Sequence, residues 1–347
     1  MTCSSTRLGL LIFMNQIPVH ITPPKPFKTY PQLVALMQQR GILVEDVARA
    51  ERKLSQVGYY RLSGFWYPCR TIDFDVRGRA RRCPQTLLPI RNNDVLPGTT
   101  FNAVFDMYLF DKKLRQAMLD AVERVEVFLR SIIAHELGYH SPLAYQDSGF
   151  VNPKWCQDYC DKRGQIRNTW NEWQSRVEKL IRESREDCIV WHRKRKKALP
   201  LWVIIETWDF GTMSRYFEIL AGKYQNKICE RLDNCKSKEL AGWLKELNTL
   251  RNRCAHHTRI WNQNTGNSLS VTSVPRLVAL GLNEHALSKL YGQICVLWHL
   301  VTLIGPSSNW ISMVADIVDS KPSLPNCGFT AMGFPDDTGF PRQLFYV

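Results

Sequence analysis

Residues 101–138, FNAVFDMYLFDKKLRQAMLDAVERVEVFLRSIIAHELG, carry the strongest helical pattern in this 347-residue chain. Thr99 or Thr100 can cap its start, and Gly138 is a typical end. Asp111 interrupts the apolar face, so we expect a kink or a break there. The apolar side chains recur at spacings of three and four: Phe101, Val104, Phe105, Tyr108, Leu109, Leu114, Met118, Ala121, Val122, Val125, Leu129, Ile132 and Ile133. This stretch predicts a long amphipathic helix, and therefore a mainly α fold.

On both sides of this helix, the sequence predicts further helices with few strands. A short β-ribbon is possible within 70–100, and 139–169 looks irregular. The aromatic-rich segment 59–68 is expected to be a buried loop, with base stacking by its tyrosines and Arg61 as the alternative. Helical patterns occupy 31–40, 44–57, 170–197, 200–208, 213–220, 223–235, a segment beginning at Ser237, and 284–304.

The same patterns suggest four parts of the chain. We expect residues 1–24 to be extended or disordered, and 25–98 to form an N-terminal helical segment with a basic insertion. Residues 99–304 should form the main helical domain. Residues 305–347, rich in Pro and Gly, should contain one short helix and then a tail on the surface.

Composition points to an anionic partner. The chain has 46 Lys and Arg against 32 Asp and Glu, a net charge of +14, with 44% hydrophobic residues. Such a charge favours nucleic acid first and a membrane surface second, and solubility alone is the plain alternative. No apolar run reaches the length of a membrane span, so we expect no membrane association. The cysteines contain no CxxC, and Cys156 and Cys160 have no matching second pair. We therefore expect no zinc site, and reduced thiols in a cytoplasmic protein.

Two basic clusters are candidate RNA-binding segments. Each can be a solvated surface or a contact to phosphates, because phosphate contacts need only exposed cations. The first lies in the predicted insertion and consists of Arg77, Arg79, Arg81 and Arg82. The second ends the helical pattern at 170–197 and consists of Arg193, Lys194, Arg195, Lys196 and Lys197.

Residues 251–262, RNRCAHHTRIWN, hold three arginines, two histidines and two asparagines at the end of another apolar helical pattern. At about 100° per residue, Asn252, His256 and Arg259 share one side of the helix, whereas Arg251 points about 140° away from His256. One interpretation is a helix end whose side chains cap carbonyls and pair with acids. The other is a phosphate-binding catalytic site, with His257 in a supporting role.

A second Arg-x4-His occurs in the long helix, as Arg130 and His135. Glu126 lies one turn before Arg130 on the same face, which is the spacing of an ion pair. This pair can simply brace the helix. Alternatively, Arg130 and His135 join the first motif in one cleft.

These residue types suit cleavage of RNA without a metal. Histidine can act as base or acid near neutral pH, and arginine presents a fixed fork of donors to phosphate. Our hypothesis assigns acid/base chemistry to His256, the phosphate clamp to Arg251, and orientation to Asn252. The second-rank candidates are His257, Arg259, Glu126, Arg130 and His135. We expect no metal or cofactor.

The motif at 251–262 resembles the signature of abortive-infection proteins of the AbiD/AbiF type, in the HEPN superfamily. Its longer form, RNxxAHHxRxWN, is much more specific than a bare Arg-x4-His. The resemblance runs from about 25 to 335 and includes further stretches: VGYYRLSGFWYP at 57–68, the segment 123–138, FGTMS at 210–214 and MGFP at 332–335.

The resemblance implies a HEPN-like helical bundle and a toxin-like endoribonuclease of phage defence. Such proteins build the site from two motifs, within one chain or across a homodimer. The implied products are a 2′,3′-cyclic phosphate and a 5′-OH. RNA would be the substrate, and a bound RNA or a protein would restrain the resting enzyme. Two alternatives remain open: a non-catalytic RNA-binding protein in a defence complex, and a helical scaffold with a basic surface.

Overall fold

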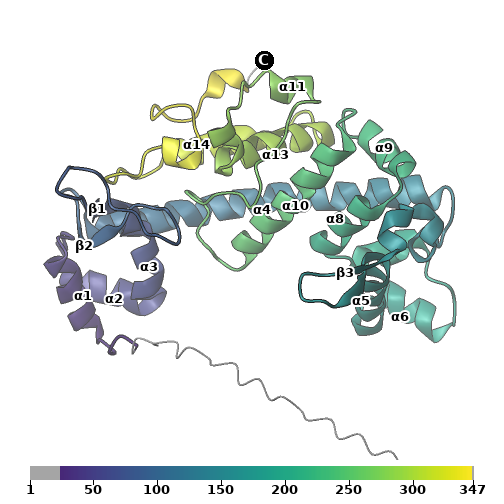
Figure 1. The fold of residues 1–347 in the computed structure, drawn as a ribbon, viewed down its shortest axis with the longest axis horizontal. Coiled ribbons are helices and arrows are strands. Elements are labelled where there is room, and N and C mark those ends of the chain that lie inside the picture. The colour runs from purple at the N-terminus through teal and green to yellow at the C-terminus, as the bar shows by residue number, and fades with distance from the viewer. Residues whose placement is uncertain (1–23, 346–347) are drawn as a thin grey trace, which may run out of the picture.

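The computed structural model describes residues 24–345. Almost all of the N-terminal part expected to be extended, 1–24, therefore lies outside the described residues. A single helix, α4 (Phe101–Gly138), runs across the whole molecule (Figure 1). The Thr100 hydroxyl accepts the backbone N–H of Ala103 at 3.1 Å and caps its start.

The predicted kink at Asp111 is wrong, because α4 continues through this residue. The Asp111 side chain does not compete with the hydrogen bonds of its own helix. Its Oδ1 instead accepts backbone N–H groups from Ile260 and Trp261, far along the chain. The hydrogen-bonding capacity of the Asp111 carboxylate, which interrupts the apolar face, is thus satisfied by tertiary contacts.

The fold is mainly α, as predicted. In the described part of the chain, the only named strands form two two-stranded antiparallel sheets, β1 (Arg70–Ile72) with β2 (Arg91–Val95) and β3 (Asp158–Cys160) with β4 (Ile166–Asn168). The other helices are α1 (Tyr30–Gln39), α2 (Val47–Val57), α3 (Tyr59–Trp66), α5 (Thr169–Glu183), α6 (Asp187–Lys194), α7 (Leu201–Ile204), α8 (Phe210–Ile219), α9 (Gly222–Glu230), α10 (Ser237–Ala255), α11 (Pro275–Val278), α12 (Glu284–Leu287), α13 (Leu290–Ile304) and α14 (Trp310–Asp319).

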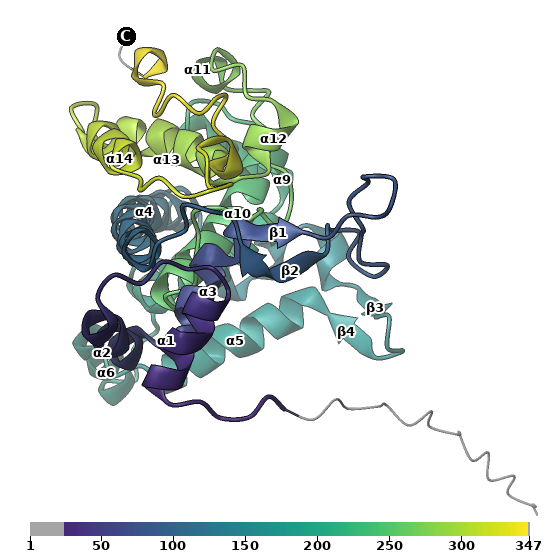
Figure 2. The same cartoon turned by 90° about the vertical axis from the view of Figure 1, so that its left-hand side faces the viewer.

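The other helices pack around α4 (Figures 1 and 2). Helices α13 and α14 cover one side of it, α10 crosses it, and α3 contacts it near its start. Helices α7 and α9 pack on it as well, and α5 reaches it through α8 and α10. The core between these layers is rich in aromatic residues: Trp66, Trp208, Trp243, Trp261, Trp310, Tyr145, Tyr216, Tyr291, Phe210, Phe217 and Phe334 are all buried.

The segment expected to be a buried aromatic loop is mostly the helix α3. Gly58, with φ of +86°, separates it from α2, a conformation that favours glycine. Leu62, Phe65 and Trp66 are buried along one face at the spacing of a helix. The aromatic content that suggested a loop is therefore explained by burial on one side of a short helix.

Two helices predicted as continuous are each divided in two. The pattern at 170–197 forms α5 and α6, because the chain is extended at Ser184. Arg193 donates to the carbonyls of Ile181 and Ser184 at 3.1 and 2.9 Å, which satisfies groups at the end of α5. The pattern at 284–304 forms α12 and α13.

The β-ribbon expected within 70–100 is present as β1 and β2, and β3 and β4 form a second ribbon in the region predicted to be irregular. Both ribbons project from the same side of the molecule, toward the right of Figure 2. Within residues 24–345, no helix has the length and apolar character needed to cross a membrane.

Candidate functional site

The central motif lies where α10 ends. His256 is the last half-helical residue, and His257 adopts a left-handed conformation with φ of +57°. The Thr258 N–H donates to the Arg253 carbonyl at 2.8 Å, the bond of a Schellman motif. The chain thus turns sharply out of the helix. Both histidines are exposed at this turn, rather than packed in a dry interior.

The segment after the turn is anchored to α4 by Asp111. Its Oδ1 accepts the N–H groups of Ile260 and Trp261, each at 2.9 Å, and its Oδ2 pairs with Arg115 one turn along α4. Asp111 is fully buried, and Arg115 is 5% exposed. Burial raises the pKa of the Asp111 carboxyl, while Arg115 and the two N–H groups oppose this effect. A buried carboxylate therefore fixes the position of the motif relative to the central helix.

His256 and His257 line a cavity of about 360 Å³ between α10, α3 and α4. Arg61 of α3 closes one side by donating from Nη1 to the His257 carbonyl at 2.7 Å. The lining contains three arginines, two histidines and no carboxylate: Tyr60, Arg61, Gly64, Phe65, Tyr108, Arg115, His256, His257, Thr258, Arg259 and Gln263. This arrangement favours an anionic ligand.

Arg259 belongs to the inner part of this cavity. Burial lowers the pKa of its guanidinium, and the nearby Asp111 opposes the shift. With the Gln263 amide turned so that its oxygen faces Arg259, this oxygen accepts from Arg259 Nη2 at 2.9 Å and from Nε at 3.3 Å. Arg259 Nη1 is buried and has no hydrogen-bond partner among the described residues. One strong donor on this arginine is therefore unused.

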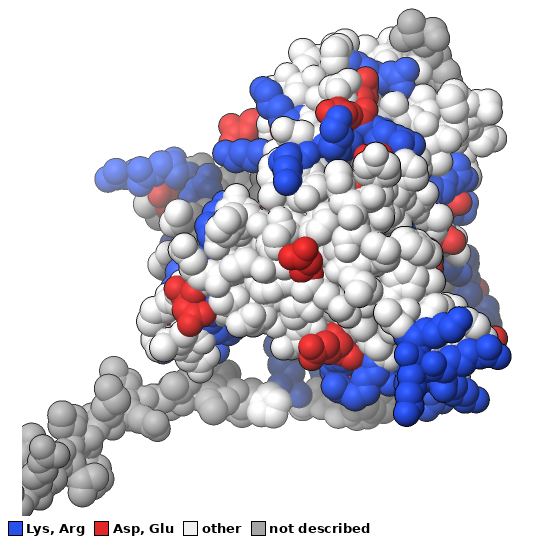
Figure 3. Space-filling view, turned by 90° about the vertical axis from the view of Figure 1, so that its right-hand side faces the viewer, with Lys and Arg blue, Asp and Glu red and all other residues white. Residues whose placement is uncertain are grey.

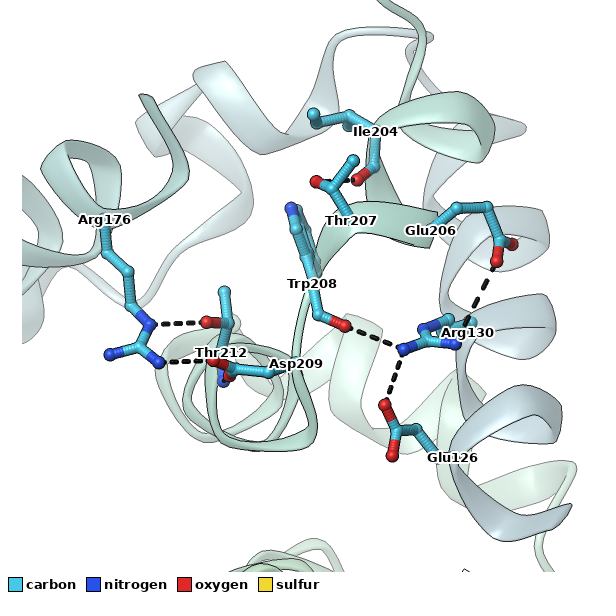
Figure 4. A network of polar contacts seen from close by, with 9 residues as sticks. All are labelled: Glu126, Arg130, Arg176, Ile204, Glu206, Thr207, Trp208, Asp209 and Thr212. Carbon is cyan, nitrogen blue, oxygen red and sulfur yellow. Dashed lines mark hydrogen bonds and ion pairs between the residues drawn. The ribbon is translucent and has the colours of Figure 1, made fainter. Parts of the chain in front are cut away.

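The second motif forms a polar network centred on Arg130 (Figure 4). Arg130 Nη2 lies 2.5 Å from Glu126 Oε1 and donates to the Trp208 carbonyl at 2.8 Å, while Nη1 lies 4.0 Å from Glu206. The predicted ion pair between Glu126 and Arg130 is therefore confirmed. Burial raises the pKa of Glu126, although the charges of Arg130 and Arg251 act to lower it. Arginines from both motifs thus act on one carboxylate.

Asp209 extends this region toward α5 (Figure 4). Its Oδ1 caps α8 by accepting the Thr212 N–H at 2.7 Å, and its Oδ2 lies 2.5 Å from Arg176 Nη2. These contacts account for the FGTMS stretch at 210–214 as the start of a capped helix. The sequence patterns did not point to Asp209 or Arg176 as members of the network.

The two histidines of the Arg-x4-His motifs line different cavities. His135 lies with Arg130, Trp202 and Glu206 around a cavity of about 560 Å³, and its Nδ1 lies 3.3 Å from Glu136. The cavity of His256 shares none of these lining residues. Within one chain, the histidines of the two motifs therefore do not share a cavity, although the charge of Arg251 acts on Glu126 of the second motif.

The three first-rank residues do not all border one cavity either. Arg251 influences Glu126 and is not among the residues lining the cavity of His256. Asn252 is exposed on α10. The arginines that line the cavity of His256 are instead Arg61, predicted here only as an RNA contact, Arg259, predicted as a second-rank candidate, and Arg115, to which no sequence prediction pointed. Its pairing with Asp111 at a spacing of four was the available signal.

The arginines in the segment that connects β1 and β2 are partly neutralised. Arg79 pairs with Asp75 at 3.1 Å, and Arg81 lies 3.5 Å from Asp73. Arg82 donates to the Leu87 carbonyl, and Arg77 forms no ion pair within residues 24–345.

The basic run 193–197 begins in the last turn of α6, is exposed, and forms the patch at the lower right of Figure 3. Arg195 and Lys197 each lie 4.8 Å from the Trp191 ring. Lys194 and Lys196 have no acidic partner in the described chain. The patch therefore presents unpaired positive charge, whereas Arg193 donates to carbonyls at the end of α5.

No three His, Cys, Asp or Glu side chains within 24–345 are grouped as metal ligands. A family model described as Abi-like protein matches residues 52–262. The match begins in α2 and ends at Asn262, so it includes α4, α10 and both motifs. No curated protein and no solved structure matches the chain.

Proposed function

Because this chain belongs to the Abi-like protein family, whose members are linked to phage defence, we propose that it is a metal-independent endoribonuclease of the HEPN type. The observation that carries this proposal is the exposed imidazole of His256 at a cavity with three arginines and no lining carboxylate. Such a lining attracts a phosphodiester and places a proton-transfer group beside it.

The reaction needs only the RNA itself as nucleophile. A base removes the proton of a ribose 2′-OH, whose oxygen attacks the adjacent phosphorus. The bond from phosphorus to the 5′ oxygen breaks, and that oxygen takes a proton from an acid. The products are a 2′,3′-cyclic phosphate and a 5′-OH. His256 serves one proton transfer, and nearby arginines stabilise charge on the phosphoryl oxygens.

The reaction needs both an acid and a base. Apart from the adjacent His257, the described residues of one chain supply only His256 to this cavity for these two roles. Because Arg251 of the same chain is not among the residues that line the His256 cavity, we propose that a homodimer completes the site. Arg251 of one copy would then act with His256 of the other. A C2 dimer would form two such sites.

The direct test is incubation of the purified protein with end-labelled RNA in excess EDTA. We expect cleavage that leaves a cyclic phosphate, loss of cleavage in His256→Ala, and retention in His285→Ala, a histidine on α12. DNA of the same sequence should remain intact. Cleavage that requires a divalent ion, or that survives in His256→Ala, would contradict the proposed mechanism.

A mixing experiment tests the shared site. His256→Ala and Arg251→Ala should each be inactive alone. After exchange of subunits, half of the dimers are mixed and each holds one intact site, so about a quarter of the wild-type activity should return. Full loss in the mixture would refute a site shared in this way.

A non-catalytic RNA-binding role is the second candidate, and the exposed Lys194 and Lys196 at the end of α6, which have no acidic partner within residues 24–345, favour it. Salt-sensitive binding of RNA without cleavage would support this role. In either case RNA is the proposed partner, as a substrate or as a regulatory molecule, and the cytoplasm is the proposed location.

A further inference from the structure

The cavity beside His256 has room for more than a phosphate group. Its volume of about 360 Å³ falls within the range of about 300–1,000 Å³ that small-ligand sites occupy. It is bounded by α3, the start of α4 and the turn after α10, so three separate segments converge on it. The lining combines aromatic rings with cations, which suits a ligand that is both planar and anionic.

The aromatic part of the lining includes a ring that takes little part in packing. Tyr60 is 91% exposed at this cavity. Tyr108 is half-buried, and Phe65 meets it edge-on with ring centroids 5.7 Å apart. A tyrosine left this open provides a face on which a base can stack, and stacking on an aromatic side chain is worth about 1–3 kcal/mol per base.

The positive charge of the lining is only partly compensated. Arg115 is paired with Asp111, whereas Arg61 bonds only to a carbonyl and Arg259 Nη1 has no partner among residues 24–345. Gly64 lies directly in front of this donor, since a Cβ there would be 3.4 Å from Arg259 Nη1. The absence of a side chain at Gly64 thus lets α3 pack closely against Arg259 at the edge of the cavity.

We propose that this cavity binds one unpaired nucleobase of a single-stranded RNA, stacked on Tyr60, with the adjoining phosphate held by Arg61 next to His256. This inference rests on the proposed function and names the form of RNA that the site takes. A base must leave its helix to enter such a cavity, so duplex RNA is excluded from it. Tyr60 is then a substrate-positioning residue.

The test uses a fluorescent 2′-O-methyl RNA oligonucleotide, which binds but lacks the nucleophile for cleavage. Fluorescence anisotropy would compare the wild type with Tyr60→Ala and with a matched control, Tyr30→Ala, which removes a tyrosine that is 46% exposed on α1. We expect Tyr60→Ala to weaken binding about 5- to 150-fold and the control to have no effect. A second variant, Gly64→Leu, fills the cavity and should weaken binding while Tyr60 remains. Circular dichroism would verify that each variant is folded.

The outcomes separate this inference from the nuclease proposal. Equal binding by the wild type, Tyr60→Ala and Gly64→Leu would overturn the base site, even if His256-dependent cleavage is seen. Selective loss in these variants without cleavage by the wild type would support the base site and refute the nuclease. Free mononucleotides test whether the bound base belongs to an RNA strand. If a mononucleotide binds strongly and displaces the oligonucleotide, the cavity is a site for a free nucleotide effector and the proposed RNA subsite is overturned. Absence of RNA binding at low salt would overturn both proposals.

Discussion

Replacing Asp111 tests how the turn after α10 is held in place. Asp111→Ala removes the acceptor of two backbone N–H groups, at 2.9 Å each, and the partner of Arg115. Breaking a buried ion pair by removing one partner costs about 3–5 kcal/mol, and each unsatisfied buried donor costs about 1–3 kcal/mol. Because these contacts share one carboxylate, the costs do not add fully. We expect a loss of at least about 3 kcal/mol in the free energy of unfolding.

Urea denaturation followed by tryptophan fluorescence would measure this loss. Native-state hydrogen exchange supplies a local readout, because the amides of Ile260 and Trp261 should lose protection in Asp111→Ala. The matched variant is Asp111→Ala with Arg115→Met, which removes both charges. We expect the double variant to recover part of the stability, since no buried cation is left without a partner.

Two results would refute this reasoning about Asp111. The first is a loss of less than about 1 kcal/mol in the free energy of unfolding of the single variant, which would be below the cost of even one unsatisfied buried donor. The second is simple additivity of the Asp111→Ala and Arg115→Met effects, which would mean that the two side chains do not interact.

Three further predictions follow from other contacts. Hydrogen bonds from Ser270, Thr272 and Ser273, acting against burial, hold the pKa of Glu239 at about 2, below its ordinary value of 4.5. This carboxylate should therefore contribute about 3 kcal/mol to the free energy of unfolding above pH 4.5, and this contribution is lost as the pH falls toward 2. The urea midpoints at pH 7 and pH 3 should differ less in Glu239→Gln than in the wild type. Glu126→Gln should lower the free energy of unfolding by about 1–3 kcal/mol, because it weakens the charge-assisted bond to Arg130, and an unchanged urea midpoint would contradict this. Replacing Lys194 and Lys196 by Ala should reduce the slope of log K against log salt for single-stranded RNA by about 1.4; an equal slope would show that this patch does not contact the strand.

The sequence alone determined the mainly helical class and the position of the longest helix. The apolar stripe in 101–138 is a local pattern, and a helix that buries one face along its length needs no knowledge of its neighbours. The end of α10 was also visible in the sequence, because the apolar spacing stops at the polar motif. The ion pair between Glu126 and Arg130 was predictable for the same reason, since residues four apart in a helix are neighbours.

The tertiary structure alone decided what these local elements do to one another. Asp111 looked like a break in its helix because its partners, Ile260 and Trp261, lie about 150 residues away. The chain divides 170–197 into two helices at Ser184, where Arg193 folds back to donate to carbonyls at the end of α5. The cavity beside His256 is lined by residues of three separate segments, and the positions of these residues in the sequence follow no periodic pattern. Burial, long-range hydrogen bonds and the crossing of α10 over α4 are properties of the packed chain, so local patterns contain no record of them.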